Sequence, residues 1–188
     1  MEPQKQNDGV RYKLANAMKE CMRTAPVEKI TVKEIVETCG LTRQTFYRNF
    51  QDKYDLINWY FDKILLESFE HMGEGRTVYE SLVNKFEYIQ MEQLFFRAAF
   101  KNDQQNCLRD HDFELIQEFY TKQIESRTGR KISTELQFEL EMYCLGSVYM
   151  TVQWVLGYRK CTPEELPHAL TESMPVRLQD VFQELGLI

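Results

Sequence analysis

The side chains best suited to recognising another molecule lie in a short segment near the start of the chain. Phe46 and Phe50 are four residues apart, so on a helix both side chains lie on one face. The polar residues around them then point away from that face or lie at its flanks; they are Arg43, Gln44, Thr45, Tyr47 and Arg48. Arg and Gln side chains pair with guanine and adenine edges, and a Thr methyl contacts the thymine methyl. This set therefore suits direct reading of DNA bases.

Groups suited to phosphate oxygens flank the same segment. The hydroxyls of Thr31 and Tyr47 and the ammonium of Lys53 can bind the DNA backbone, which fixes register without reading sequence. A second interpretation fits the spacing equally well, because polar residues opposite Phe46 can be the solvated face of an ordinary helix. Spacing alone leaves DNA contact and a solvated face open.

Two short helices joined by a glycine turn must position these side chains. The segment ITVKEIVETCGLTRQTFYRNFQDK, residues 30–53, opens with Thr31 and Glu34 in a capping-box pattern. A three-residue turn, Cys39-Gly40-Leu41, follows, and Thr42 can cap the next helix. This layout is that of a helix-turn-helix. The apolar residues that would hold its helices crosswise are Ile35, Val36, Leu41, Phe46 and Phe50.

Helical spacing continues to the end of the chain, and no convincing run of alternating strand residues interrupts it. We therefore expect an all-α fold of about nine helices. Their expected ranges are about 9–24, 31–40, 42–49, 52–72, 77–90, 92–101, 107–127, 134–157 and 162–185. Helix starts are marked by Thr77 with Glu80, Thr134 with Gln137, and Thr162 with Glu165. Breaks are expected at 73–76, 101–104 and 128–130, and Pro167 and Pro175 should kink or divide the last helix.

Charge is distributed unevenly along the 188 residues. The chain has 23 basic and 29 acidic residues and a net charge of −6. Residues 1–53 hold ten basic and seven acidic side chains, whereas residues 54–188 hold 13 basic and 22 acidic ones. The first segment is therefore basic by three charges, and the remainder is acidic by nine. This asymmetry indicates a small basic module, suited to a polyanion, attached to an acidic body.

Several other classes of protein need sequence features that this chain lacks. No apolar run follows the N-terminus, which argues against a secretory signal. The longest uncharged stretch, residues 142–158, contains polar side chains and suits a buried helix better than a membrane span. Five cysteines without a C-x-x-C pair indicate reduced thiols and a cytoplasmic location. His71, His111 and His168 lie far apart, and common catalytic and phosphate-loop motifs are missing, so we expect neither an enzyme nor a metal or cofactor site.

The segment 30–53, together with Leu56, resembles the DNA-binding motif of the TetR/AcrR family of bacterial transcriptional regulators. The family signature reads approximately T-V-x-x-I-A-x-x-A-G-V-S-x-x-T-F-Y-x-H-F-x-x-K-x-x-L. The matching residues are Thr31, Val32, Ile35, Gly40, Thr45, Phe46, Tyr47, Phe50, Lys53 and Leu56. The conservative departures are Val36, Cys39, Leu41, Thr42 and Asn49. Asn49 keeps a hydrogen-bonding group but loses the imidazole of the usual His.

The resemblance implies two domains, with DNA binding in residues 1–53 and effector sensing and dimerisation in residues 54–188. The residues that it assigns to DNA contact are Thr31, Thr42, Thr45, Tyr47, Asn49 and Lys53. Side-chain chemistry adds Arg43, Gln44 and Arg48. The implied protein is a homodimeric, sequence-specific regulator bound to a double-stranded DNA operator, by default a repressor that leaves the operator when a ligand binds.

Two alternatives to that function stay open. The run Arg43-Gln44-Thr45-Phe46-Tyr47 resembles a subgroup that includes activators of dihydroxyacetone-kinase operons, whose members can respond to a protein coactivator instead of a small molecule. A more distant alternative is a helical enzyme or scaffold with a vestigial motif, against which the missing catalytic groups and the charge asymmetry argue. The residues identify neither the effector nor the sign of regulation.

The acidic body carries many aromatic side chains between residues 78 and 156. Aromatic residues at helical spacing indicate a core more often than a ligand pocket, and we expect a core role for most of these. Helix 134–157 is apolar almost all round, so it must be covered on several sides. With the segment 163–185 it is the expected dimer bundle, and the alternative is a helix at the centre of a monomer.

Overall fold

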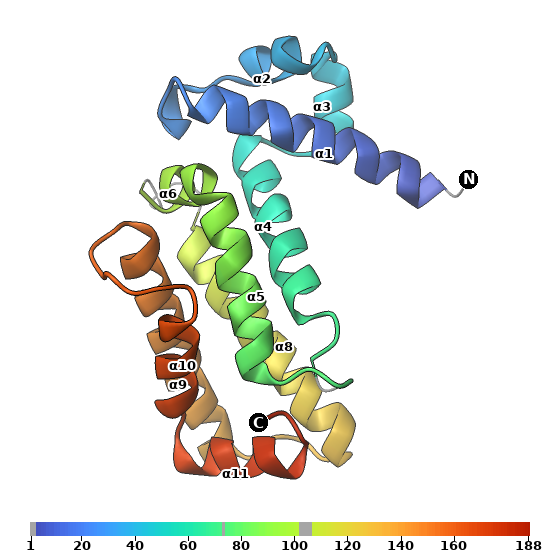
Figure 1. Cartoon of the computed structure of the whole chain (residues 1–188). Helices are drawn as coiled ribbons and strands as arrows, with labels where there is room; N and C mark the ends of the chain where they lie inside the picture. Colours follow the sequence, from blue (N-terminus) through green and yellow to red (C-terminus); the bar gives the residue numbers. More distant parts are fainter. Residues whose placement is uncertain (1–2, 73, 102–106) are drawn as a thin grey trace. The chain divides into compact units, whose positions relative to one another are not determined.

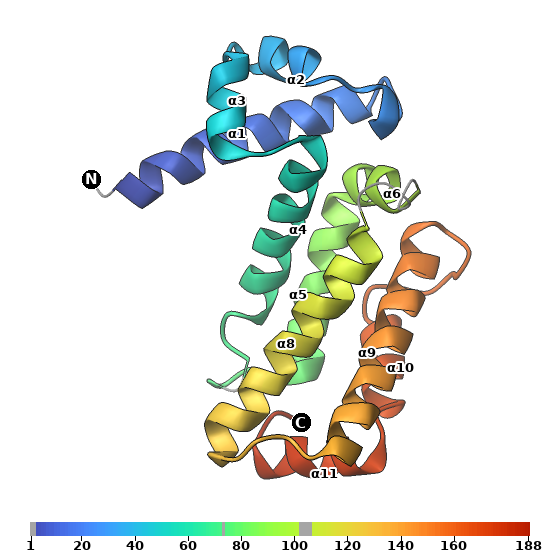
Figure 2. The same cartoon turned by 180° about the vertical axis from the view of Figure 1, so that it is seen from behind.

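The computed structural model describes residues 3–72, 74–101 and 107–188, with side chains from Asp8 onward. These described residues form ten α-helices, one short 3-10 helix and no β-strand, so the predicted all-α fold is confirmed (Figures 1 and 2). The predicted breaks at Gly73 and at residues 102–104 lie outside the described residues. None of the described helices is both long enough and apolar enough to cross a membrane.

The helices follow one another in chain order with short connections. Their bounds are α1 (Pro3–Met22), η1 (Val27–Lys29), α2 (Val32–Cys39), α3 (Arg43–Asn49), α4 (Lys53–Phe69), α5 (Val78–Met91), α6 (Gln93–Lys101), α8 (Leu108–Thr128), α9 (Thr134–Val155), α10 (Glu165–Glu172) and α11 (Val176–Glu184). The predicted helix at 162–185 is two helices, α10 and α11, while every other predicted range corresponds to one described helix.

Capping hydrogen bonds explain where the helices begin. Before α2, the Thr31 hydroxyl accepts a bond from the Glu34 N–H at 3.2 Å, and the Glu34 carboxylate accepts one from the Thr31 N–H at 2.7 Å. Thr77 and Glu80 exchange the same two bonds before α5, at 3.2 and 2.8 Å. Both capping boxes were predicted from the T-x-x-E spacing and both are confirmed.

Two predicted details of the later helices differ from the structure. The Ser133 hydroxyl caps α9 by accepting a hydrogen bond from the Leu136 N–H at 3.2 Å, so the predicted cap at Thr134 is one residue late. Pro175 divides the last helix as predicted, but Pro167 lies within the first turn of α10 without ending it. Proline is tolerated there because the N–H that it lacks would have no partner inside the helix.

The chain divides into two compact units. They comprise residues 1–63 with 92–108, and residues 64–91 with 109–188. The boundary falls within α4 and not between residues 53 and 54, because the first half of α4 packs on the helix-turn-helix. The ring centroid of Trp59, on α4, lies 5.1 Å from that of Tyr12 and 5.6 Å from that of Phe50. Residue 53 is therefore the end of the helix-turn-helix motif, whereas the compact unit that contains this motif extends to residue 63.

The first unit encloses an apolar core that anchors the helix-turn-helix. The views in Figures 1 and 2 both show α1 running along α2 and α3. Side chains no more than 2% exposed include Leu14, Met18, Ile35, Phe46, Phe50, Leu56, Ile57, Phe61, Phe95, Phe96 and Phe100. α3 itself packs against α1 and α2, and Phe50 directly after it packs against Trp59 of α4.

The second unit packs α5, α8 and α9 side by side, with α11 across one end of them (Figures 1 and 2). Phe86 and Trp154 pack edge-on with ring centroids 5.2 Å apart, and the rings of Tyr120 and Phe182 lie 5.4 Å apart. The core role predicted for the aromatic residues is confirmed for Phe86, Phe95, Phe96, Phe100, Tyr120 and Tyr143, which are buried. Tyr88, Phe138 and Tyr149 are exposed instead.

Candidate nucleic-acid interface

A glycine turn sets the angle at which α3 leaves α2. Gly40 has a φ of 65°, in the left-handed region that glycine adopts without steric cost. The Leu41 N–H then donates to the Val36 carbonyl at 2.9 Å, which closes the end of α2. Phe46, on α3, and Phe50, directly after it, are 0% and 2% exposed, and their ring centroids lie 5.8 Å apart. The predicted inward face of α3 is therefore confirmed.

The other side of α3 is open to solvent. Arg43, Gln44, Tyr47 and Arg48 are exposed. Tyr47 is 59% exposed, and its ring lies edge-on to Phe46 with centroids 5.5 Å apart, which restrains its direction. Thr45 is half-buried, and its hydroxyl lies 3.0 Å from the hydroxyl of Thr42. The structure thus brings the predicted base-reading side chains together on one short helix.

Thr31 and Thr42 each hold a hydroxyl at the start of a helix. The Thr42 hydroxyl accepts a hydrogen bond from the Thr45 N–H at 3.1 Å. The Thr31 hydroxyl donates to the Glu34 carboxylate at 2.7 Å. Hydrogen bonds from the Thr31 side chain and backbone lower the pKa of Glu34 below its ordinary value. Both threonines are exposed, so two of the predicted DNA contacts lie at the surface in fixed orientations.

Lys53 has a different environment from the one that the predicted phosphate contact requires. Its ammonium donates to the carbonyls of Val27, Glu28 and Ile30 at 2.7, 2.9 and 2.8 Å. An ammonium has three N–H donors, so these bonds leave none for a phosphate. We therefore revise the role of Lys53 to a tie between α4 and the connection from α1 to α2. Local spacing gave no signal for this tie, because the three carbonyls lie 23 to 26 residues earlier in the chain.

Asn49 and Arg11 meet at the end of α3. The Asn49 side-chain amide donates to the Thr45 carbonyl at 2.8 Å, so it bonds within its own helix. Its backbone carbonyl accepts a hydrogen bond of 3.0 Å from Nη2 of Arg11, which lies 38 residues earlier on α1. The Arg11 guanidinium also lies over the rings of Phe50 and Trp59, 4.9 and 5.2 Å from their centroids. Sequence reasoning missed Arg11 because nothing in its neighbourhood along the chain marks this contact.

A second contact that the sequence did not reveal joins α1 and α4 to the residue before α6. Lys19 donates to the Glu92 carboxylate at 2.8 Å and to the Tyr60 hydroxyl at 3.1 Å, and the Tyr60 hydroxyl donates to Glu92 at 3.2 Å. Burial alone would lower the pKa of Lys19, but the hydrogen bonds to Glu92 and Tyr60 raise it. Burial raises the pKa of Tyr60. The three groups therefore form one polar network beneath the helix-turn-helix.

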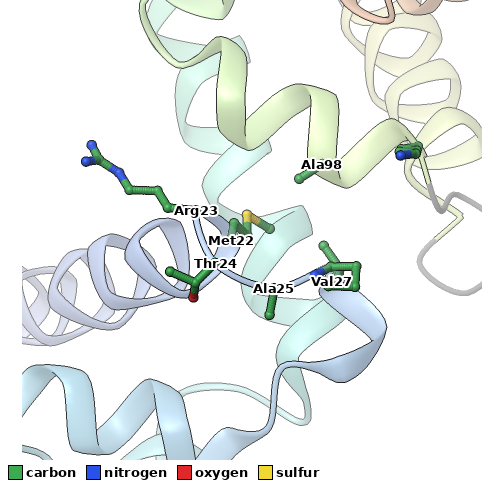
Figure 3. Close-up of a pocket in the computed structure, with 8 residues that line it drawn as sticks. Met22, Arg23, Thr24, Ala25, Val27 and Ala98 are labelled. Atoms are coloured by element: carbon green, nitrogen blue, oxygen red, sulfur yellow. The ribbon is translucent and has the colours of Figure 1, made fainter.

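An open recess of about 310 Å³ lies between the end of α1 and α6 (Figure 3). Its walls include Met22, Val27 and Ala98. In Figure 3 the Arg23 side chain extends away from Ala98, and its Nε lies 3.5 Å from the carboxylate of Glu20. Thr24 and Lys101 also line the recess, and the Thr24 hydroxyl donates to the Cys21 carbonyl at 3.1 Å. We do not assign an effector to it.

Family models match most of the chain. A model of the tetR family of bacterial regulatory proteins matches residues 15–59, which include the helix-turn-helix. A model of a transcriptional regulator C-terminal region matches residues 76–175. The two matches agree with the basic module and acidic body that the charge pattern predicted.

One curated relative is the HTH-type dhaKLM operon transcriptional activator DhaS of Lactococcus lactis subsp. lactis (strain IL1403). It is 28% identical over 90 residues, which are 48% of this chain and 48% of that protein, so the match spans about half of the relative's length.

Three solved structures share the fold. The dihydroxyacetone kinase operon activator DhaS has a TM-score of 0.69 at 18% identity, covering 91% of this chain and 97% of that one. A TetR transcriptional regulator from Streptococcus agalactiae 2603V has a TM-score of 0.61 at 20% identity, covering 92% and 97%. The repressor FadR of Thermus thermophilus, in complex with lauroyl-CoA, has a TM-score of 0.56 at 18% identity, covering 89% and 96%.

Proposed function

Because this chain belongs to the TetR family of bacterial transcriptional regulators, we propose that it is a homodimeric repressor that binds a DNA operator in the cytoplasm and leaves it when an effector binds. The observation that carries the proposal is the exposed polar side of α3, fixed from behind by the buried Phe46 and Phe50. The family matches and structural neighbours are regulators, which argues against the alternative of a helical enzyme or scaffold.

In the proposed complex, α3 enters the major groove. Residues in the first turn of a recognition helix typically reach base edges, so Gln44 and Arg43 are the proposed readers. Gln44 ranks first because it projects opposite the Phe46 and Phe50 side and its amide can pair with adenine. Thr45 and Arg48 are the next candidates for base contact. The proposed phosphate contacts are Thr31, Thr42, Tyr47 and Asn49.

Selection from a randomised DNA pool tests this proposal directly. The full chain should enrich one sequence arranged as two half-sites, and the DNA flanking its own gene should contain a related site. A protein that enriches no common sequence at low salt, where phosphate contacts are strongest, would refute sequence-specific binding.

An exposed apolar stripe on α9 supports the homodimer. Phe138, Met142, Leu145 and Tyr149 are 64, 57, 46 and 58% exposed, and their spacing of four, three and four residues places them on one face of the helix. The neighbouring face of α9 is packed in the second unit. Fully burying such a side chain is worth about 1.5–3 kcal/mol, so covering four half-exposed ones on each protomer favours association. We propose that α9 pairs with a second copy here, with α10 and α11 completing the interface.

A second candidate function is activation under the control of a protein coactivator. The likeness to DhaS in both the curated relative and the solved structure favours it, because that protein is described as an operon activator. The likeness to FadR, solved with lauroyl-CoA, favours a repressor with a small-molecule effector. Both schemes require an effector that binds the DNA-competent and DNA-incompetent states with different affinities.

A reporter gene behind the selected operator separates the two functions. Deleting the regulator should raise expression if it is a repressor and lower expression if it is an activator. Adding candidate small molecules to purified protein on operator DNA should release a ligand-responsive repressor, whereas a regulator that depends on a coactivator should respond only when the partner protein is present.

A further inference from the structure

We propose that Arg11 is a positioning residue for DNA recognition, which sets the register in which α3 meets base edges. This inference rests on the proposed DNA binding and adds a residue outside the helix-turn-helix to it. Nη2 of Arg11 donates to the Asn49 carbonyl, at the last residue of α3, over 3.0 Å. The last carbonyls of a helix have no partner inside the helix, and a cation there also favours the negative end of the helix dipole. Arg11 therefore supplies a hydrogen-bond donor and a positive charge to the last carbonyl of α3.

The same guanidinium is held in place from two further elements. Phe50, directly after α3, and Trp59, on α4, are 2% and 9% exposed, and the guanidinium carbon lies 4.9 and 5.2 Å from their ring centroids. Contacts at these distances are cation–π interactions, which arginine makes with its flat face while its N–H groups remain free to donate. One side chain of α1 thus joins α3, the residue that follows it and α4.

The Asn49 side chain does not supply an equivalent tie to another helix. Its amide donates to the Thr45 carbonyl, four residues earlier in α3. Because α3 has only seven residues, a small rotation at its end moves Gln44 and Arg43, at its start, relative to the bases. Recognition groups need their geometry held to about 0.5 Å by supporting contacts. The link from Arg11 to the Asn49 carbonyl is such a contact.

The competing role for a cation on this surface is direct contact with a phosphate. The two roles predict different results for two substitutions. Arg11→Met removes the charge and the hydrogen bond, whereas Arg11→Lys keeps the charge but loses the flat guanidinium. Lys13→Met, which replaces an exposed cation on the same helix, is the matched control for removal of a charge from α1.

The experiment uses the full chain and the operator that the wild type selects from a randomised pool. Affinity for that operator and for a random duplex is measured over a salt series, and the melting temperature of each variant is recorded without DNA. We expect Arg11→Met to lower the ratio of operator to random affinity by about tenfold, comparable to one mismatched base pair. The dependence of log affinity on log salt should stay unchanged, Arg11→Lys should recover only part of the ratio, and Lys13→Met should leave it intact.

Two results would overturn the inference while leaving the proposed function standing. One is an unchanged ratio of operator to random affinity in Arg11→Met. The other is a salt dependence that becomes shallower by about 0.9 for each phosphate that the variant no longer neutralises and is restored by Arg11→Lys, which would make Arg11 a phosphate ligand. If Arg11→Met fails to fold, the comparison rests on Arg11→Lys. A wild type that selects no sequence refutes the proposed function itself, and the inference with it.

Discussion

Replacing Lys53 by methionine should reduce stability without weakening the contacts to phosphate. The Lys53 ammonium donates three hydrogen bonds to backbone carbonyls between α1 and α2, two of them half-buried and one exposed. Water can replace the exposed bond, whereas each half-buried bond contributes about 1 kcal/mol net. Lys53→Met should therefore lower the free energy of unfolding by about 2 kcal/mol, which for a chain of this size lowers the melting temperature by about 4–8 °C.

The assay has two parts, and both use Lys33→Met as the control. Lys33 is an exposed cation on α2 whose ammonium lies 3.7 Å from the Glu37 carboxylate, an exposed pair of little energetic value. Thermal unfolding followed by circular dichroism, without DNA, should show the fall in melting temperature for Lys53→Met only. Operator affinity measured over a salt series should give Lys53→Met the same dependence of log affinity on log salt as the wild type.

The opposite pattern would show that this reasoning is wrong. If the carbonyl bonds contribute little to stability and Lys53 is a phosphate ligand instead, Lys53→Met should melt close to the wild type without DNA. Its salt dependence should then become shallower by about 0.9 for each phosphate that the variant no longer neutralises, one for each protomer of the dimer. That result would return Lys53 to the phosphate contacts that the motif predicted.

Three further predictions concern other parts of the molecule. Gln44→Ala should weaken binding to the selected operator by about 1–3 kcal/mol and relax the base preference at one position in each half-site, with little change in melting temperature. If the variant and the wild type select identical sequences, another residue reads that base. Leu145→Glu should convert a dimer of twice 22.5 kDa to a monomer in sedimentation, and an unchanged dimer would remove the α9 stripe from the interface. Thr31→Ala should melt below the wild type at pH 7. Because the Thr31 side chain lowers the pKa of Glu34 in the folded state, this part of the stability is present above the ordinary pKa of 4.5 and is lost as the pH falls through the folded value. The difference in melting temperature should therefore become smaller in acid, and the remainder reflects the capping bond from the Glu34 N–H, which does not titrate.

Features that depend on neighbours along the chain could be predicted from the sequence. The capping boxes at Thr31 and Thr77 need a glutamate three residues later, and the inward face of α3 needs only the spacing of Phe46 and Phe50. The start of α9 was misplaced by one residue because Ser and Thr cap helices almost equally well and stand next to each other there. Local chemistry thus predicted most of the helices and the position of the candidate recognition surface.

Features that depend on distant segments could not be predicted in this way. Lys53 and Arg11 make their hydrogen bonds to carbonyls 23 to 38 residues away, and a carbonyl carries no signature in the sequence. Burial likewise depends on how helices pack: among the aromatic residues predicted as core, Phe86 is fully buried, while Phe138 and Tyr149 lie on the exposed side of α9. Helical spacing showed that α9 is apolar on nearly all sides. It did not show which side packs within the protomer and which side is exposed.

The net charge of residues 1–53 is larger than the positive charge that is free to contact DNA. Residues 1–53 carry an excess of three positive charges. Yet the Lys53 ammonium is surrounded by carbonyls, the Arg11 guanidinium by a carbonyl and two rings, and the Lys19 ammonium is paired with Glu92. These three cations stabilise the module through contacts within the protein. Their charged groups are already used there, so we do not count these cations as phosphate ligands. Arg43 and Arg48, exposed on α3 beside Gln44, are the charges left where the bases would be read. In the proposed complex, Arg43 and Arg48 therefore place positive charge on the helix that reads the bases, and Lys53, Arg11 and Lys19 help to hold that helix in position.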